Sequence, residues 1–115
     1  MKILVIEPSK HPRIAEIDGS LKSMQAIVGG YIQAIYPFDD PVALVCDEEG
    51  LFKETKWNRR VTQDCAIKGT FFLCGIGEED FGDIPEDLIE KYSKQFFEPE
   101  EFEFIPPPIR VIRFW

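Results

Sequence analysis

The sequence predicts a single small α+β domain built on a mostly antiparallel sheet, with two helices and an extended C-terminal strand. Short apolar stretches recur along the chain and are separated by Gly, Pro and Asp turn residues. Two other stretches carry apolar residues at helical spacing. The connections are short, and strands do not alternate with helices of the length that a parallel sheet needs, which favours antiparallel pairing.

The first predicted elements are a hairpin and a helix. Residues 2–7 form an apolar run that ends at Pro8 and predict a buried strand, which pairs with a weaker strand over residues 13–17. The helix should begin after Ser20, whose hydroxyl can accept from free backbone N–H groups, and end at Gly29, which adopts the left-handed conformation cheaply. Its apolar face consists of Leu21, Met24, Ile27 and Val28.

Two more strands are expected in the middle of the chain, over residues 30–36 and 42–46. Residues 47–50 read Asp-Glu-Glu-Gly and predict a hairpin loop that leads into Leu51 and Phe52. Residues 53–66 are polar and show no clear periodicity, so we expect irregular structure there.

A long strand and a second helix follow. Residues 67–75 contain the apolar run Phe-Phe-Leu-Cys and predict a strand. Asp83 is expected to cap a helix that reaches about Phe97, with Pro85 in its first turn and Glu86 at capping-box spacing. Its buried stripe consists of Leu88, Ile89, Tyr92 and Phe96.

The chain divides into a domain at residues 1–97 and an acidic, proline-rich extension at residues 98–115. The 115 residues suffice for one domain, and 44% hydrophobic residues is typical of a globular core. Three prolines at 106–108 enforce an extended segment, and residues 109–115 then alternate like an edge strand. Such a strand needs a sheet edge, either that of its own domain or that of a partner chain, and the second case predicts a homodimer formed through residues 109–115.

The negative charge lies almost entirely in one segment. The whole chain carries a net charge of −8, whereas residues 78–103 hold eleven acidic residues against Lys91 and Lys94, a net charge of −9. This charge disfavours nucleic acid and anionic membranes as partners. The segment is either a solvated face or, in the second interpretation, the surface through which residues 78–103 bind a basic protein partner.

The cysteines and the N-terminus indicate a reducing compartment. Cys46, Cys65 and Cys74 are odd in number and form no Cys-x-x-Cys pair. We expect Cys46 and Cys74 to lie in strands as small apolar residues. No stretch has the apolar length of a signal peptide or a membrane helix, so a cytoplasmic location is expected.

Catalytic and metal-binding patterns are missing from the sequence. The sole histidine, His11, lies beside Pro12 with no second histidine or cysteine pair at ligand spacing. Gly75 and Gly77 end a strand but precede acidic residues that would repel phosphate. We therefore expect no metal and no cofactor, assign no catalytic residues, and rank an enzyme last among the possible functions.

One polar cluster has the residue types of a binding site. Trp57 offers a stacking surface, Asn58 a donor and an acceptor, and Arg59 a planar fork for anions. The loop could hold a small ligand or nucleotide, which is the alternative function. In the other interpretation, Asn58 is a turn residue and Arg59 satisfies backbone carbonyl groups.

An ordered set of segments resembles a known family. The set comprises residues 27–33 (Ile-Val-Gly-Gly-Tyr-Ile-Gln), 43–45, 47–50, 58–59, 67–72 and 78–81. In this order they resemble the uncharacterised family named domain of unknown function 3846, over about residues 1–95. Members of that family occur in phages, plasmids and conjugative elements of bacteria. The resemblance implies a protein of a mobile element, and it directs attention to Gly29, Gly30, Gln33, Asn58 and Arg59 without giving them a catalytic role.

The expected function is therefore a non-catalytic binding or accessory protein of a bacterial mobile element or phage, acting through protein–protein contacts.

Overall fold

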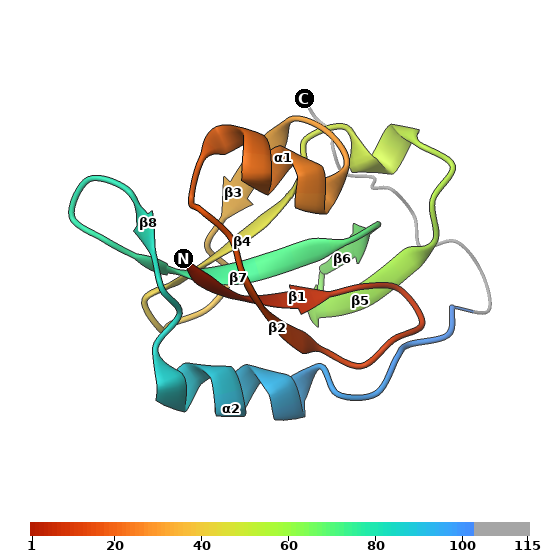
Figure 1. The fold of residues 1–115 in the computed structure, drawn as a ribbon. Helices are drawn as coiled ribbons and strands as arrows, with labels where there is room; N and C mark the ends of the chain where they lie inside the picture. The colour runs from red at the N-terminus through yellow and green to blue at the C-terminus, as the bar shows by residue number, and fades with distance from the viewer. Residues whose placement is uncertain (103–115) are drawn as a thin grey trace.

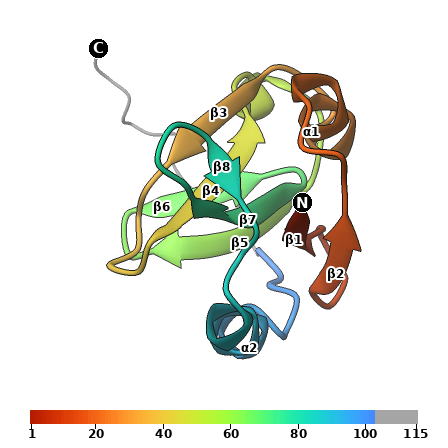
Figure 2. The same cartoon turned by 60° about the vertical axis from the view of Figure 1, so that its left-hand side comes forward.

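The computed structural model describes residues 1–102, which form an antiparallel sheet with a helix on each face (Figure 1, Figure 2). The strand order is β2-β1-β7-β4-β3, and β8 pairs with β7. These strands are β1 (Lys2–Ile6), β2 (Arg13–Glu16), β3 (Ile32–Ile35), β4 (Val42–Asp47), β7 (Phe71–Ile76) and β8 (Phe81–Gly82). The helices are α1 (Leu21–Val28) and α2 (Glu86–Gln95). The predicted α+β class is confirmed.

The core lies on both faces of the three central strands β1, β4 and β7. Successive side chains of a strand point to opposite faces, so each strand serves two clusters. The cluster facing α1 includes Ile3, Val5, Ala43, Val45, Phe72 and Cys74. The cluster facing α2 includes Leu4, Ile6, Leu44, Cys46, Phe71 and Leu73. Both faces are covered, which explains why these strands read as continuous apolar runs.

Helix α1 begins and ends as its sequence predicts. The Ser20 hydroxyl oxygen accepts a hydrogen bond of 3.1 Å from the Ser23 N–H. Gly29 ends the helix with φ +82°, and its N–H donates to the Gln25 carbonyl. Met24 and Val28 pack on the sheet, but Leu21, which was expected on the apolar face, is 56% exposed.

Helix α2 has the predicted buried stripe but a different start. Its N-cap residue is Pro85, which provides no side-chain cap, and the helix ends at Gln95. The Asp83 carboxylate accepts from the Lys2 N–H at 2.8 Å, and Glu86 pairs with the Lys2 ammonium at 2.8 Å. The predicted cap at Asp83 is wrong because a residue distant in the sequence takes both carboxylates. Leu88, Ile89, Tyr92 and Phe96 are all buried, as expected.

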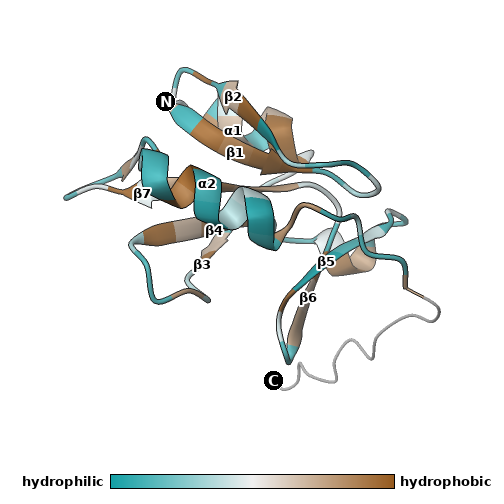
Figure 3. Ribbon diagram, turned by 90° about the horizontal axis from the view of Figure 1, so that it is seen from below, coloured by the Kyte–Doolittle hydropathy of each residue, from teal (hydrophilic) through white to brown (hydrophobic). Residues whose placement is uncertain are grey.

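A second, two-stranded sheet occupies the region that was expected to be irregular. It pairs β5 (Trp57–Thr62) with β6 (Cys65–Lys68), and its register shifts twice. The single strand expected over residues 67–75 is therefore wrong. Gly69, with φ +83°, turns the chain from β6 into β7 of the main sheet. The hairpin extends away from the main sheet when viewed from below (Figure 3).

The turn after β4 also differs from the expected hairpin loop. A short 3₁₀ helix, η1 (Gly50–Phe52), follows directly. The Asp47 side chain accepts from the Glu49 N–H at 2.9 Å, which favours a local turn over strand pairing. The predicted strand at residues 109–115 and the proline segment lie outside the described residues. Within residues 1–102 no helix is long and apolar enough to cross a membrane.

Candidate functional site

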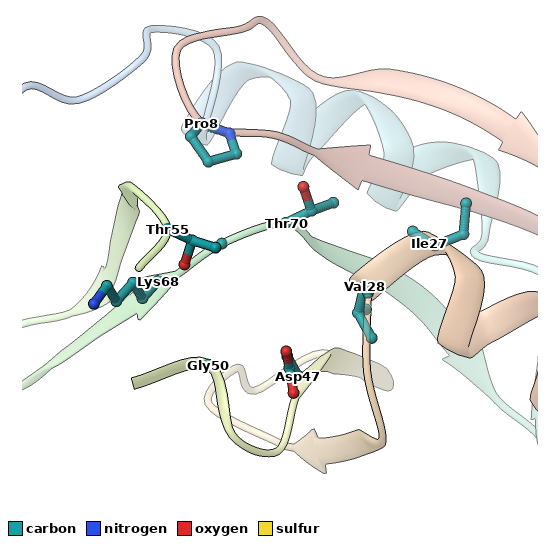
Figure 4. Close-up of a pocket in the computed structure, with 10 residues that line it drawn as sticks. Pro8, Ile27, Val28, Asp47, Gly50, Thr55, Lys68 and Thr70 are labelled. Atoms are coloured by element: carbon teal, nitrogen blue, oxygen red, sulfur yellow. The ribbon is translucent and has the colours of Figure 1, made fainter. Parts of the chain in front are cut away.

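A pocket of about 260 Å³ opens at the C-terminal end of α1. Five segments line it: the β1–β2 turn, the end of α1, the end of β4 with η1, the loop before β5 and the β6–β7 turn (Figure 4). Its lining residues are Pro8, Ile27, Val28, Gly29, Asp47, Gly50, Thr55, Lys68, Gly69 and Thr70. Carboxylate, ammonium, hydroxyl and backbone groups all border this space, so it could bind a small polar ligand.

Asp47 and Lys53 form the most buried ion pair at this pocket. The two side chains meet at 2.6 Å, and only 6% of the Asp47 side chain is exposed. The Lys53 ammonium also donates to the Gly29 carbonyl at 3.1 Å. A cation at that position compensates the partial negative charge of the α1 C-terminus. The pair fixes η1 against α1 and shapes one wall of the pocket.

The glycines highlighted by the sequence lie beside this ion pair. Gly29 has the left-handed conformation and borders the pocket. A Cβ atom on Gly30 would lie 2.7 Å from both an Asp47 carboxylate oxygen and the Lys53 nitrogen. The absence of a side chain at residue 30 therefore leaves room for the pair. Gln33 lies elsewhere, exposed on β3 opposite Cys46.

Asn58 is fully buried and serves two parts of the main sheet. Its amide nitrogen donates to the carbonyl oxygens of Ile6 and Gly69, each at 2.8 Å. Its side-chain oxygen accepts from Arg59 at 2.8 Å. These contacts attach β5 to the end of β1 and to the turn before β7, and they leave the amide no exposed surface.

Arg59 is also buried, with 1% of its surface exposed. The guanidinium donates to the carbonyl oxygens of Phe96 and Lys10, the latter at 2.6 Å. Burial lowers the pKa of this group from its usual value, and the nearby Glu100 opposes that effect. The side chain faces the protein interior, where it satisfies backbone carbonyls, and it is not presented to solvent with Trp57.

Trp57 contacts the chain beyond α2. Its ring centroid lies 5.9 Å from that of Phe102, and the Arg60 guanidinium lies 5.9 Å from the Phe102 centroid. The Glu100 carboxylate accepts from the Arg60 N–H at 2.6 Å. Of the three residues predicted as one binding loop, Trp57 thus lies toward the C-terminal segment while Asn58 and Arg59 point into the core.

Acidic residues surround α2 and the β7–β8 loop. All ten acidic residues between residues 78 and 101 are exposed. Several already have partners in the protein: Asp83 and Glu86 contact Lys2, Glu90 contacts Lys94, and Glu100 contacts Arg60. The outward face of α2 is correspondingly hydrophilic (Figure 3).

Large apolar side chains are exposed near the pocket, on η1 and at the start of β3. Phe52 is 88% exposed, Tyr31 67% and Leu51 43%. The backbone brings these segments together, because the Glu48 N–H donates to the Tyr31 carbonyl at 2.8 Å and Lys53 reaches Gly29. We call Tyr31, Leu51 and Phe52 the apolar patch.

The remaining chemically reactive groups are held in structural contacts. The His11 ring stacks on Phe97 at 4.1 Å, and its Nδ1 lies 2.6 Å from the Phe97 carbonyl. Burial raises the pKa of the Cys74 thiol to about 12 and that of Cys46 to about 11, which disfavours the reactive thiolate. Within residues 1–102 no group of three or more His, Cys, Asp and Glu side chains could hold a metal ion.

Sequence reasoning missed Asp47, Lys53 and Lys68 as site residues. A signal was present, because three of the segments behind the family resemblance meet at the pocket: residues 27–33, 47–50 and 67–72. Their convergence depends on the β4–η1 turn and the β6–β7 turn, neither of which was predicted correctly.

Comparison with known proteins identifies the family but no characterised relative. No curated protein and no solved structure matches the chain. The family model described as domain of unknown function (DUF3846) matches residues 1–97. The chain therefore belongs to the DUF3846 family.

Proposed function

We propose that this protein is a non-catalytic binding or accessory protein of a bacterial mobile element or phage, that it works in the cytoplasm, and that it acts through protein–protein contacts. The observation that carries the proposal is the apolar patch, above all Phe52 with 88% of its surface exposed. A scattered apolar residue is common on protein surfaces, but a group of large ones on adjoining segments is typical of an interaction site. Aromatic residues are also enriched among those that dominate binding energy.

The frame beneath the patch favours binding. The Phe52 N–H donates to the Glu49 carbonyl at 3.0 Å, and the Lys53 N–H donates to the Gly50 carbonyl at 3.2 Å. The Asp47–Lys53 pair then fixes this turn against α1. A patch on an ordered frame loses little conformational entropy when a partner binds, which increases affinity.

The acidic residues of α2 and the β7–β8 loop supply a second reason to expect a protein partner. Glu78, Glu79 and Asp87 are exposed and make no ion pair within the described residues. Exposed charges contribute more to the rate of association and to partner choice than to affinity. We therefore expect a partner with a basic surface, whose binding slows as salt concentration rises.

Site-specific photo-cross-linking tests the proposal. A photoreactive phenylalanine analogue at position 52 should give one dominant protein adduct in the native host. The same analogue at Tyr36, which is 60% exposed on the segment after β3, is the matched control and should not give that adduct. With the identified partner, Phe52→Ser should weaken binding at least tenfold. Equal adducts at both positions, or none at position 52, would contradict the proposal.

A second candidate function is small-ligand binding, and the pocket of about 260 Å³ favours it. The ligand would lie among Asp47, Thr70 and Lys68 and not on the Trp57–Arg59 loop, because Asn58 and Arg59 are buried. A thermal-shift screen with nucleotides and polar metabolites tests this function, since a bound ligand raises the melting temperature. A true ligand should raise the melting temperature of the wild-type protein more than that of Thr70→Val. If no compound does so, this function is ruled out.

A further inference from the structure

The outer surface of the β5–β6 hairpin combines positive charge with an aromatic ring. Residues 53–68 contain five basic and two acidic residues, in a chain whose net charge is −8. Arg60 is exposed, and the Lys68 ammonium lies 5.9 Å from the centroid of the Trp57 ring. We call Trp57, Arg60 and Lys68 the hairpin surface.

A short acidic segment of the same chain already lies on this surface. The Glu100 carboxylate accepts from the Arg60 N–H at 2.6 Å, and Phe102 contacts both the Trp57 ring and the Arg60 guanidinium. Glu100 and Phe102 thus both lie against β5, Glu100 at Arg60 and Phe102 near both Arg60 and Trp57. Alternate residues of an extended chain share one side, so the intervening Glu101 is left exposed.

Trp57 also carries a donor that no described residue uses. Its indole N–H is buried and has no hydrogen-bond partner among the described residues. A buried donor without an acceptor is destabilising, and a carboxylate is the strongest acceptor that a peptide can offer. A longer acidic peptide on this surface could supply that acceptor in addition to the contacts that Glu100 and Phe102 make.

We propose that the hairpin surface binds an extended acidic peptide of a partner protein, with the pattern Glu-x-Phe, and that Glu100 and Phe102 act as its internal competitor. The inference rests on the proposed function, since it assumes that the protein acts through protein contacts. The chain's own segment shows the chemistry that the surface accepts: a carboxylate at the Arg60 N–H and an aromatic ring between Arg60 and Trp57.

A partner peptide must bind the hairpin surface tightly enough to displace the segment that contains Glu100 and Phe102. A tethered segment acts at an effective concentration of about millimolar, so a peptide with the same few contacts would displace it only at that concentration. A partner succeeds by adding contacts, for example to Lys68 and to the Trp57 N–H. Removing the side chains of Glu100 and Phe102 should therefore strengthen binding of an external peptide, whereas a purely structural role predicts no binding at all.

Single-stranded nucleic acid offers similar chemistry, since it combines an anion with a flat ring. The ten exposed acidic residues between residues 78 and 101 would repel its phosphates, so an acidic peptide is the better occupant. Oligo(dT) of matched length therefore belongs in the test as a competing ligand.

Fluorescence anisotropy with the full-length protein provides the test. The probe is a labelled peptide with the sequence of residues 97–105 (Phe-Glu-Pro-Glu-Glu-Phe-Glu-Phe-Ile), and the control peptide has every Glu replaced by Gln. Glu100→Ala/Phe102→Ala should bind the probe at least tenfold more tightly than wild type. Adding Arg60→Glu should abolish this gain, and adding Lys68→Gln provides a second surface variant should the first fail to fold. Lys22→Glu, on the exposed surface of α1, is the matched charge control and should leave the gain in peptide affinity unchanged.

Three results would overturn the inference: no gain in the double variant, equal binding of the Gln peptide, or tighter binding of oligo(dT) than of the probe. Light scattering covers a fourth outcome, because a wild-type dimer that the double variant converts to monomer would identify a second copy of the chain as the occupant instead. The cross-linking result at position 52 is independent of the hairpin surface. If it persists while peptide binding fails, the inference alone is wrong and the proposed function stands.

Discussion

The Arg59 guanidinium donates two hydrogen bonds to the Phe96 carbonyl, from Nε at 3.1 Å and from Nη2 at 2.9 Å. Phe96 directly follows the last residue of α2, where backbone carbonyls lack helical partners. A buried positive charge at that point also compensates the negative end of the helix dipole. Since Nη2 reaches the Lys10 carbonyl as well, one side chain joins β5, α2 and the β1–β2 turn.

We expect Arg59→Lys to destabilise the protein by about 2 kcal/mol or more, although the charge is kept. A lysine ammonium cannot reproduce the planar set of donors, so buried carbonyls lose partners that cost about 1–3 kcal/mol each. Urea unfolding monitored by circular dichroism measures the difference in the free energy of unfolding. Arg60→Lys is the matched control and should stay within about 0.5 kcal/mol, because Arg60 is exposed. Equal effects of the two variants would show that Arg59 does not hold these segments together.

The sequence pattern predicted the elements that pack on the apolar core. The strands β1 and β4, the apolar run of β7, the Ser20 cap and the stripe of α2 follow from local sequence, whereas the expected start of β7 at residue 67 does not. The β5–β6 hairpin could not be predicted in this way. Asn58 and Arg59 occupy buried positions that a pattern rule assigns to apolar residues, and two register shifts break the period of two.

Only part of the candidate site could be predicted, because its residues meet through contacts between distant segments. The family resemblance singled out Gly30, and the polar residue types singled out Asn58, but neither signal reveals what each residue contacts. The pocket depends on the Lys53 ammonium, which contacts both Asp47 and Gly29. Gly29 lies 24 residues before Lys53 in the sequence. Such pairings depend on the packed fold and leave no periodic signal in the sequence.

Gly30→Ala should destabilise the protein by about 1–2 kcal/mol through the Asp47–Lys53 pair. The new methyl group would lie 2.7 Å from an oxygen of Asp47 and from the Lys53 nitrogen, so the ends of these side chains must shift, which weakens the pairing of a mostly buried carboxylate with its cation. Thermal unfolding measures the loss. Gly82→Ala is the matched control, since a Cβ there meets nothing within 4 Å.

A double substitution tests whether the ion pair is the cause of the destabilisation by Gly30→Ala. In a Lys53→Ala background one of the two clashing groups is already gone, so Gly30→Ala should cost less than in wild type. If the two substitutions are instead additive, the cost of Gly30→Ala arises from something other than the ion pair.

Asp18 should make stability depend on pH in the acid range. Hydrogen bonds from Ser20 and then Ser23 lower the pKa of its carboxyl from 3.8 to about 2 in the folded protein. A lowered pKa means that the folded state favours the charged form. The stabilisation is therefore fully present above about pH 4 and is lost as the pH falls toward 2. Asp18→Asn should show a shallower fall in the free energy of unfolding between pH 4 and 2, and an unchanged slope would contradict this assignment.

Cys65 should react first among the three thiols. Burial raises the pKa of all three, but Cys74 and Cys46 are buried with pKa values of about 12 and 11, whereas Cys65 is partly exposed. The thiolate is the reactive form, so at pH 8 a disulfide reagent such as DTNB should label one thiol per native chain in a first phase and the other two only at the rate of unfolding. Cys65→Ser should remove the first phase and leave the slow phase unchanged. If the first phase persists in that variant, the reagent reaches Cys46 or Cys74 without global unfolding. The face of the sheet that carries that cysteine would then open by local unfolding.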